Sequence, residues 1–154
     1  ILLAVVIVNP PQDAGQVAID DPIEDYREAV RQAAKNALTA ARNKLEEGEH
    51  IARILLITVY VNAEEGYSTQ AKIADHASQY FCEELGEAGI GSRAAVGVAS
   101  LPGNAPVEIS IIAPWASEAD MKVFLCESIH PQALELLKSR AEVISDWDRL
   151  DEVD

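Results

Sequence analysis

The sequence is poor in basic residues. Lysine and arginine together number 12 against 26 acidic residues, which gives a formal net charge of −14 at pH 7. Nucleic acids and anionic lipid surfaces are held mainly by lysine and arginine, so this charge argues against both as partners. We therefore expect the protein to bind neither nucleic acid nor a membrane.

Cysteine is also scarce, and no histidine follows a cysteine at the spacing that is typical of metal sites. The two cysteines, Cys82 and Cys126, lie far apart, and neither a CxxC nor a CxxH motif occurs. A zinc site or a disulfide framework needs such spacing. We expect two reduced thiols in a cytoplasmic protein, and no metal site.

Long hydrophobic runs are missing as well. The opening run ILLAVVIV (1–8) ends at the turn 9–11, is too short to cross a membrane, and lacks the basic flank of a signal peptide. It is typical of a β-strand. With a hydrophobic fraction of 49% over 154 residues, the chain can bury one core of ordinary size.

Hydrophobic periodicity predicts the element order β-β-α-β-α-β-β. Strands are expected over 1–8, 16–19, 50–63, 93–101 and 106–113, and helices between Asp21 and Gly48 and between Ser68 and Gly86. Turn residues at 102–104 predict that the last two strands form a hairpin. The order favours an α+β fold, with one mixed sheet that carries both helices on one face. Its uncovered face predicts a homo-oligomer.

The pattern starts again after residue 117. A strand over 121–128, a helix over 130–140 and a strand from 141 predict a βαβ opening. We therefore expect a domain over 1–117 and an incomplete, truncated βαβ-like segment over 118–154. The segment resembles the start of D-isomer-specific 2-hydroxyacid dehydrogenases, but it has no glycine-rich dinucleotide turn and implies no dehydrogenase activity.

Two charged residues interrupt the nearly apolar stretch 91–114. Glu108 alternates with Val107 and Ile109, which places it on the opposite face from that apolar row. Glu108 and Arg93 can form an exposed or intersubunit salt bridge, or they can be opposite halves of a small-molecule site. The residue types suit the second interpretation, because a guanidinium grips a carboxylate with two parallel bonds and a carboxylate can exchange protons with water.

The sequences ILLITVYVNA, GSRAAVGVASLP and VEISIIA resemble the RidA family, also called the YjgF family, over about residues 1–114. The resemblance implies a chorismate-mutase-like fold and a homotrimer with clefts between subunits. It also implies hydrolysis, without metal or organic cofactor, of reactive enamines and imines such as 2-aminoacrylate to a keto acid and ammonia. By position, Arg93 corresponds to the arginine that clamps the carboxylate of a small metabolite, and Glu108 to the glutamate associated with the attacking water.

Three positions depart from the family pattern. The turn 9–11 reads Asn-Pro-Pro where active members carry a Ser-Gly-Gln type turn, and the prolines remove an amide donor. Asp75 and His76 stand where a similar branch has asparagine and glycine. An aspartate near Arg93 competes with an anionic substrate or selects a different one, so Asp75 is a predicted substrate-binding residue. His76 is either a proton shuttle or a packed helix residue. The alternative function is a catalytically silent trimer that binds a small carboxylate.

Overall fold

The computed structural model describes residues 2–7, 15–117, 122–124, 135 and 142–144. The chain divides into two compact units. The first comprises Ile1–Leu45 and Ile51–Trp115, and the second comprises Glu46–His50 and Ala116–Asp154. The turn 9–11 and Cys126 lie outside the described residues.

The first unit is built on a four-stranded mixed sheet with the order β1-β5-β3-β4. Its strands are β1 (Leu2–Ile7), β5 (Val107–Ala113), β3 (Leu56–Asn62) and β4 (Ser92–Val98). β5 is antiparallel to both β1 and β3, whereas β3 and β4 are parallel. β4 is therefore an edge strand with a single neighbour in the sheet.

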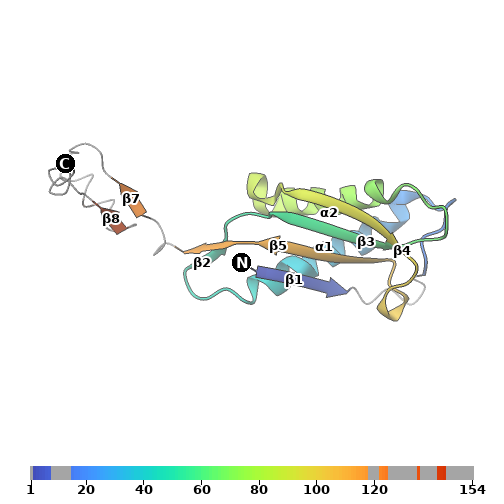
Figure 1. Cartoon of the computed structure of the whole chain (residues 1–154), viewed down its shortest axis with the longest axis horizontal. Coiled ribbons are helices and arrows are strands. Elements are labelled where there is room, and N and C mark those ends of the chain that lie inside the picture. The colour runs from blue at the N-terminus through green and yellow to red at the C-terminus, as the bar shows by residue number, and fades with distance from the viewer. Residues whose placement is uncertain (1, 8–14, 118–121, 125–134, 136–141, 145–154) are drawn as a thin grey trace, which may run out of the picture. The chain divides into compact units, whose positions relative to one another are not determined.

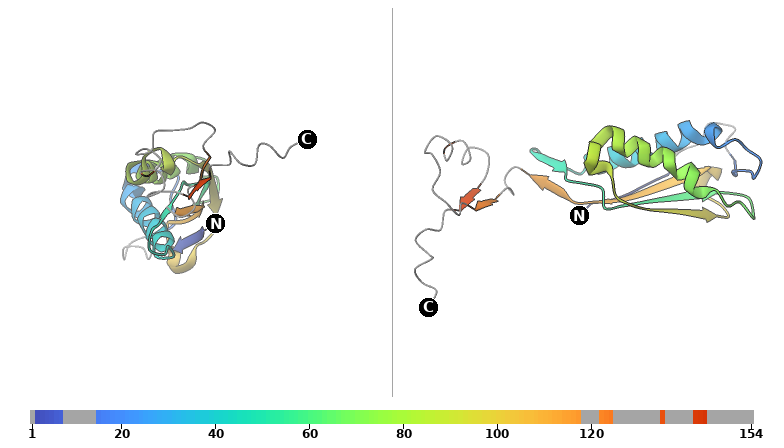
Figure 2. Two further views of the ribbon diagram at one scale, coloured as in Figure 1. Left: turned by 90° about the vertical axis from the view of Figure 1, so that its left-hand side faces the viewer. Right: turned by 90° about the horizontal axis from the view of Figure 1, so that it is seen from above.

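Two helices cover one face of this sheet (Figures 1 and 2). α1 (Arg27–Arg42) follows a short 3₁₀ helix, η1 (Ile23–Tyr26), and α2 (Gln70–Leu85) connects β3 to β4. Four alanines of α1 are fully or almost fully buried, and such small side chains let a helix lie close to a sheet. α2 ends at Gly86, whose positive φ of 60° suits a glycine.

The core lies between the helices and the sheet. β5 alternates strictly along its length, with its odd-numbered residues buried and its even-numbered residues half-buried. β3 shows the same alternation at Ile57, Val59 and Val61, which are buried. The half-buried side chains of these two strands form the opposite, open face of the sheet, which neither helix covers (Figure 2). We call this surface the open face.

The predicted fold class is confirmed, because the first unit is α+β with two helices on one face of a mixed sheet. Two predicted strands are corrected. The segment expected as a strand over 16–19 is reduced to one isolated parallel bridge, between Val17 and Ala63. The extended stretch is this short because turn residues follow it at once. The strand expected over 50–63 is divided into β2 (Glu49–Ile51) and β3.

The predicted hairpin is also wrong, because β4 and β5 do not pair with each other. The β3-α2-β4 crossover makes β3 and β4 parallel neighbours, and β5 takes the other side of β3. The connection between them contains η3 (Pro102–Asn104), in which Gly103 and Asn104 both have positive φ. β3 therefore separates the two strands that carry Arg93 and Glu108.

The remaining strands are short. β2 pairs with β6 (Trp115–Ser117), and β7 (Lys122–Phe124) pairs in parallel with β8 (Glu142–Ile144). A parallel pair is what a βαβ connection produces. Apart from residue 135, the helix predicted over 130–140 lies outside the described residues, and the division into domains at residue 117 stays a prediction.

Candidate functional site

Arg93 lies near the start of the edge strand β4. Its Cα partner in the parallel register is Ile57 of β3, whose side chain is buried beneath the helices. Paired residues of neighbouring strands point to the same face, so Arg93 points to the helix side of the sheet. There it meets α2.

Arg93 is held by two side chains that are three residues apart on α2. Its Nη1 donates to Asp75 Oδ1 at 2.8 Å and to Ser78 Oγ at 3.0 Å. The side chains of Arg93 and Asp75 remain 26% and 56% exposed, so this ion pair contributes little to the free energy of folding. Among the described residues, Arg93 Nη2 and Nε make no hydrogen bond, so their N–H groups remain available as donors.

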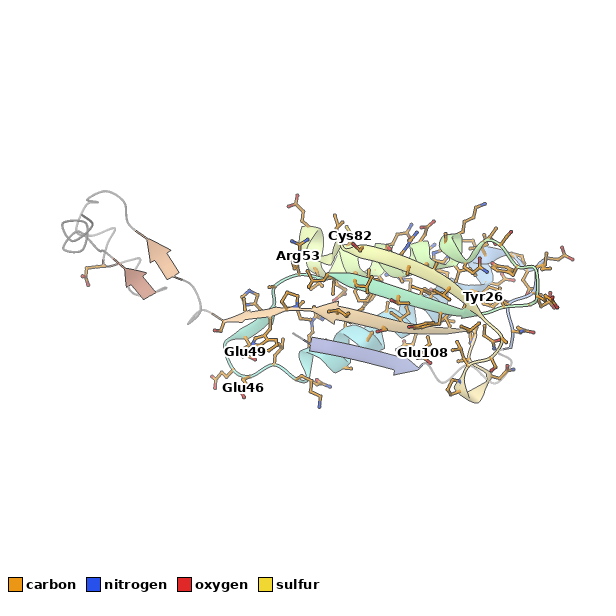
Figure 3. All side chains as sticks on the ribbon, viewed as in Figure 1. Tyr26, Glu46, Glu49, Arg53, Cys82 and Glu108 are labelled. Atoms are coloured by element: carbon orange, nitrogen blue, oxygen red, sulfur yellow. The ribbon has the colours of Figure 1, made fainter. Side chains whose placement is uncertain are left out.

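Glu108 lies on the other face of the sheet. It is half-buried, its neighbours Val107 and Ile109 are fully buried, and its Cα partner on β3 is Tyr60. The predicted orientation of Glu108 away from the apolar row is thus confirmed. Figure 3 shows Glu108 on β5, well apart from Cys82 on α2. One copy of the chain brings Asp75 to Arg93 but places Glu108 on the opposite side of the sheet.

A cavity of about 280 Å³ adjoins the Arg93 cluster. Two residues connect them, because Ile57 and Ser78 line the cavity and are also the strand partner and the hydrogen-bond partner of Arg93. The lining comprises Ile57, Ser78, Gln79, Cys82, Gly89, Ile90 and Gly91. Sequence reasoning missed Ser78 as a site residue, although its spacing of three from Asp75 places both on one side of the helix.

Two glycines let the loop before β4 come close to the rest of the cavity wall. A Cβ atom on Gly89 would lie 2.1 Å from the carbonyl oxygen of Phe81, and one on Gly91 would lie 2.7 Å from that of Ile54. Both distances are too short for a side chain. These residues therefore serve close backbone packing, in addition to the helix stop and turn that the sequence predicts.

A second cavity, of about 450 Å³, lies at the carboxyl ends of the parallel strands β3 and β4. Its lining includes Glu64, Glu65 and Gln70 but no lysine or arginine. Gln16 closes one side, since its Nε2 donates to the carbonyl oxygens of Ala63 and Ala99. This cavity has no basic side chain in its lining, whereas the first adjoins Arg93.

His76 is buried on α2, with 6% of its surface exposed. Its Nε2 lies 3.9 Å from Glu24 Oε1, and neither ring nitrogen has a hydrogen-bond partner among the described residues. His76 faces η1, whereas Asp75 faces β4, so these two neighbouring residues of α2 lie in different surroundings. The position favours the packed-residue interpretation of His76 over the proton shuttle.

Where the structure describes the chain, no cluster of three or more histidine, cysteine, aspartate or glutamate side chains could hold a metal ion. Within the same residues, none of the helices has the length and the apolar character needed to cross a membrane.

Comparisons with known proteins identify the family. A family model described as endoribonuclease L-PSP matches residues 8–115. Protein TCP17 of Trypanosoma cruzi is 28% identical over 99 residues, which cover 64% of this chain, and the chain spans 62% of the length of that curated relative.

Solved structures agree with that match. A protein of unknown function from Agrobacterium tumefaciens is 30% identical with a TM-score of 0.59, over 73% of this chain and 72% of that one. A protein from Shewanella oneidensis, described as a candidate endoribonuclease, shares the fold with 22% identity and a TM-score of 0.57, over 73% and 75% of the two chains. With a family model matched along most of its length, the chain belongs to the endoribonuclease L-PSP family, the RidA family that its strand motifs indicate.

Proposed function

We propose that the protein hydrolyses small enamine or imine intermediates that carry a carboxylate, of the 2-aminoacrylate type, to a keto acid and ammonia. The observation that carries the proposal is the placement of Arg93. Its guanidinium is fixed at Nη1 by Asp75 and Ser78, has no hydrogen bond at Nη2 or Nε among the described residues, and adjoins a cavity of small-molecule size. A guanidinium so fixed can bind a carboxylate and position the adjacent C=N carbon.

The reaction needs no redox step. An enamine first gains a proton on its terminal carbon and loses one from nitrogen, which gives the imine. Water adds its oxygen to the C=N carbon while one of its protons passes to the nitrogen. The remaining hydroxyl proton then passes to the nitrogen as the C=O bond forms, the C–N bond breaks and ammonia leaves. A carboxylate can hold the water and carry its proton, and Glu108 is the candidate for this role. No step of this scheme calls for a metal or an organic cofactor.

The proposed site requires more than one copy of the chain. Arg93 lies on an edge strand and Glu108 on the open face, so a single copy does not place both in one cleft. In a homotrimer, the edge strand of one copy can meet the open face of the next, which brings one copy's Arg93 toward its neighbour's Glu108. We also propose that the protein acts in the cytoplasm.

A coupled assay tests the proposal. A pyridoxal-phosphate enzyme that releases 2-aminoacrylate from serine is mixed with the purified protein, and the rate of pyruvate formation is followed. We expect acceleration by the wild type and a loss of about 100-fold or more in Arg93→Ala, because the carboxylate clamp is removed. Glu83→Gln, on the same helix as Asp75 but paired with Arg31, is the control and should retain activity. An Arg93→Ala protein as active as the wild type would rule out this role.

A catalytically silent binding protein is the second candidate. The observation that favours it is the Asp75–Arg93 ion pair, because any ligand carboxylate must share the guanidinium with an internal one. Binding of small acids that depends on Arg93, without acceleration of pyruvate formation from any of several amino-acid precursors, would establish it.

The family description also raises endoribonuclease activity. The net charge of −14 opposes it, because RNA backbones bind through several basic contacts and the described site offers Arg93 alone. RNA cleavage that survives rigorous nuclease removal and disappears in Arg93→Ala would reverse this conclusion.

A further inference from the structure

The Asp75–Arg93 pair places two opposite charges side by side, and both side chains are partly exposed. Arg93 uses Nη1 for Asp75 Oδ1, which leaves Nη2 and Nε without a recorded partner in the described part of the chain. Asp75 likewise uses Oδ1, and its Oδ2 has no recorded partner there. The open atoms are therefore an anion-binding edge on Arg93 and a cation-accepting oxygen on Asp75.

From this geometry we infer that Asp75 makes the site selective for a zwitterion, a small molecule with a protonated nitrogen next to its carboxylate, over a plain carboxylate. The inference rests on the proposed function, since it assumes that Arg93 binds the ligand carboxylate. It names Asp75 as the residue that decides which carboxylates are accepted.

The charges explain the selection. A plain carboxylate on Arg93 lies close to the carboxylate of Asp75, and two like charges that share one guanidinium repel each other. A zwitterion avoids this cost, because its protonated nitrogen can donate to Asp75 Oδ2 while its carboxylate accepts from Arg93. Charge-assisted hydrogen bonds of this kind are among the stronger ones in proteins.

Ser78 completes the arrangement. Its Oγ accepts from Arg93 Nη1, which leaves the hydroxyl hydrogen free to donate, and the residue lines the 280 Å³ cavity. Most of the other lining side chains offer no charge, so the cavity can hold the small uncharged remainder of the ligand. Asp75 thus contributes to recognition, although an internal carboxylate beside a carboxylate-binding arginine first suggests an obstacle.

The test compares two probes that differ only in the α-ammonium group, alanine and propionate. Their dissociation constants are measured by calorimetry or by competition for the wild type and for Asp75→Asn, which keeps the shape and removes the charge. We expect the wild type to prefer alanine by about tenfold, the ratio that one charged hydrogen bond is worth. In Asp75→Asn, propionate should bind more tightly and alanine more weakly, so that the ratio falls toward one.

Two variants serve as controls. Glu65→Gln also removes one negative charge, but from an exposed residue on the loop after β3, at the second cavity, and should leave the ratio unchanged. Arg93→Ala should lose both probes. An unchanged ratio in Asp75→Asn, equal wild-type affinity for both probes, or no binding of either would overturn the inference.

Binding and turnover separate this inference from the proposed function. If the ratio responds to Asp75→Asn while pyruvate formation is never accelerated, the selectivity holds and the hydrolase fails. If hydrolysis occurs but Asp75→Asn leaves the ratio as it was, the hydrolase holds and the role of Asp75 fails.

Discussion

Tyr26 is hydrogen-bonded to the turn that precedes the helices. Its hydroxyl donates to Asp21 Oδ2, which also accepts from the backbone amide of Ala18. Burial, followed by the hydrogen bond and the charge of Asp21, raises the pKa of Tyr26 from 10.0 to about 12. A group whose pKa is raised by folding stabilises the folded protein by its full amount at pH values below the pKa that it has in the unfolded chain. This stabilisation is lost as the pH rises through the pKa that the group has in the folded protein.

The change Tyr26→Phe tests this contribution. We expect the free energy of unfolding of the wild type to fall between pH 10 and pH 12, by on the order of 1 kcal/mol after allowance for solvent screening. The variant lacks the titrating hydroxyl, so its curve should be flatter over that range. Urea unfolding at several alkaline pH values measures both curves. Parallel curves would show that Tyr26 does not carry the effect.

Single residues of the site could be predicted to different extents. The motif positions pointed to Arg93 and Asp75, and strand alternation gave the face of Glu108. Their mutual contacts could not be predicted, because the position of α2 over β4 is set by packing of the whole unit and not by local pattern. Ser78 was missed for this reason. The first helix was expected between Asp21 and Gly48, but α1 begins later, at Arg27, and Asp21 accepts a hydrogen bond from Tyr26 instead.

At the scale of elements, the segment between α2 and β4 shows how backbone packing shapes the cavity beside Arg93. Ile54 donates its backbone amide to the carbonyl of Ala88, and Gly89 packs against the carbonyl of Phe81. This segment and the end of α2 form one tight wall.

The change Gly89→Ala should destabilise the protein by about 2 kcal/mol or more, because the new Cβ collides with backbone that cannot move aside easily. Urea unfolding at neutral pH measures the loss. Gly15→Ala is the matched control, since its nearest atom would be Asn104 Nδ2 at 3.8 Å, and it should change stability little. Equal stability of the two variants would contradict the tight packing.

Elements with strong local signals were predicted well, whereas their pairing was not. Helical spacing located α1 and α2, and β-branched runs located β3, β4 and β5. Which strands become neighbours depends on how chain segments far apart in the sequence meet. Two strands joined by a turn usually pair with each other, but here β4 and β5 lie on opposite sides of β3, and β5 pairs with β3 and β1.

At the scale of the whole molecule, the open face is where we expect other copies to bind. Val96 of β4 is 40% exposed, and its Cα partner is Tyr60, whose side chain lies on that face. The change Val96→Lys should shift the protein toward monomers, because burying a lysine in an interface is costly. Light scattering coupled to size exclusion reads the mass.

Ile19→Lys is the control for this variant. Ile19 is 55% exposed but lies outside the strands of the sheet, so the substitution should leave the assembly intact. If Val96→Lys keeps the wild-type mass, the copies associate through another surface.

The pairing of β1 has a consequence for how the protein is made. β1 forms its ladder with β5 alone in this sheet, from Leu2 opposite Ala113 to Ile7 opposite Glu108. During synthesis, this apolar strand emerges from the ribosome before β5 and must wait until the chain between the two strands has been translated before its partner exists. Contacts of such long sequence separation slow folding and leave strand edges open to aggregation. The nascent chain therefore depends on protection of β1 until β5 has been translated.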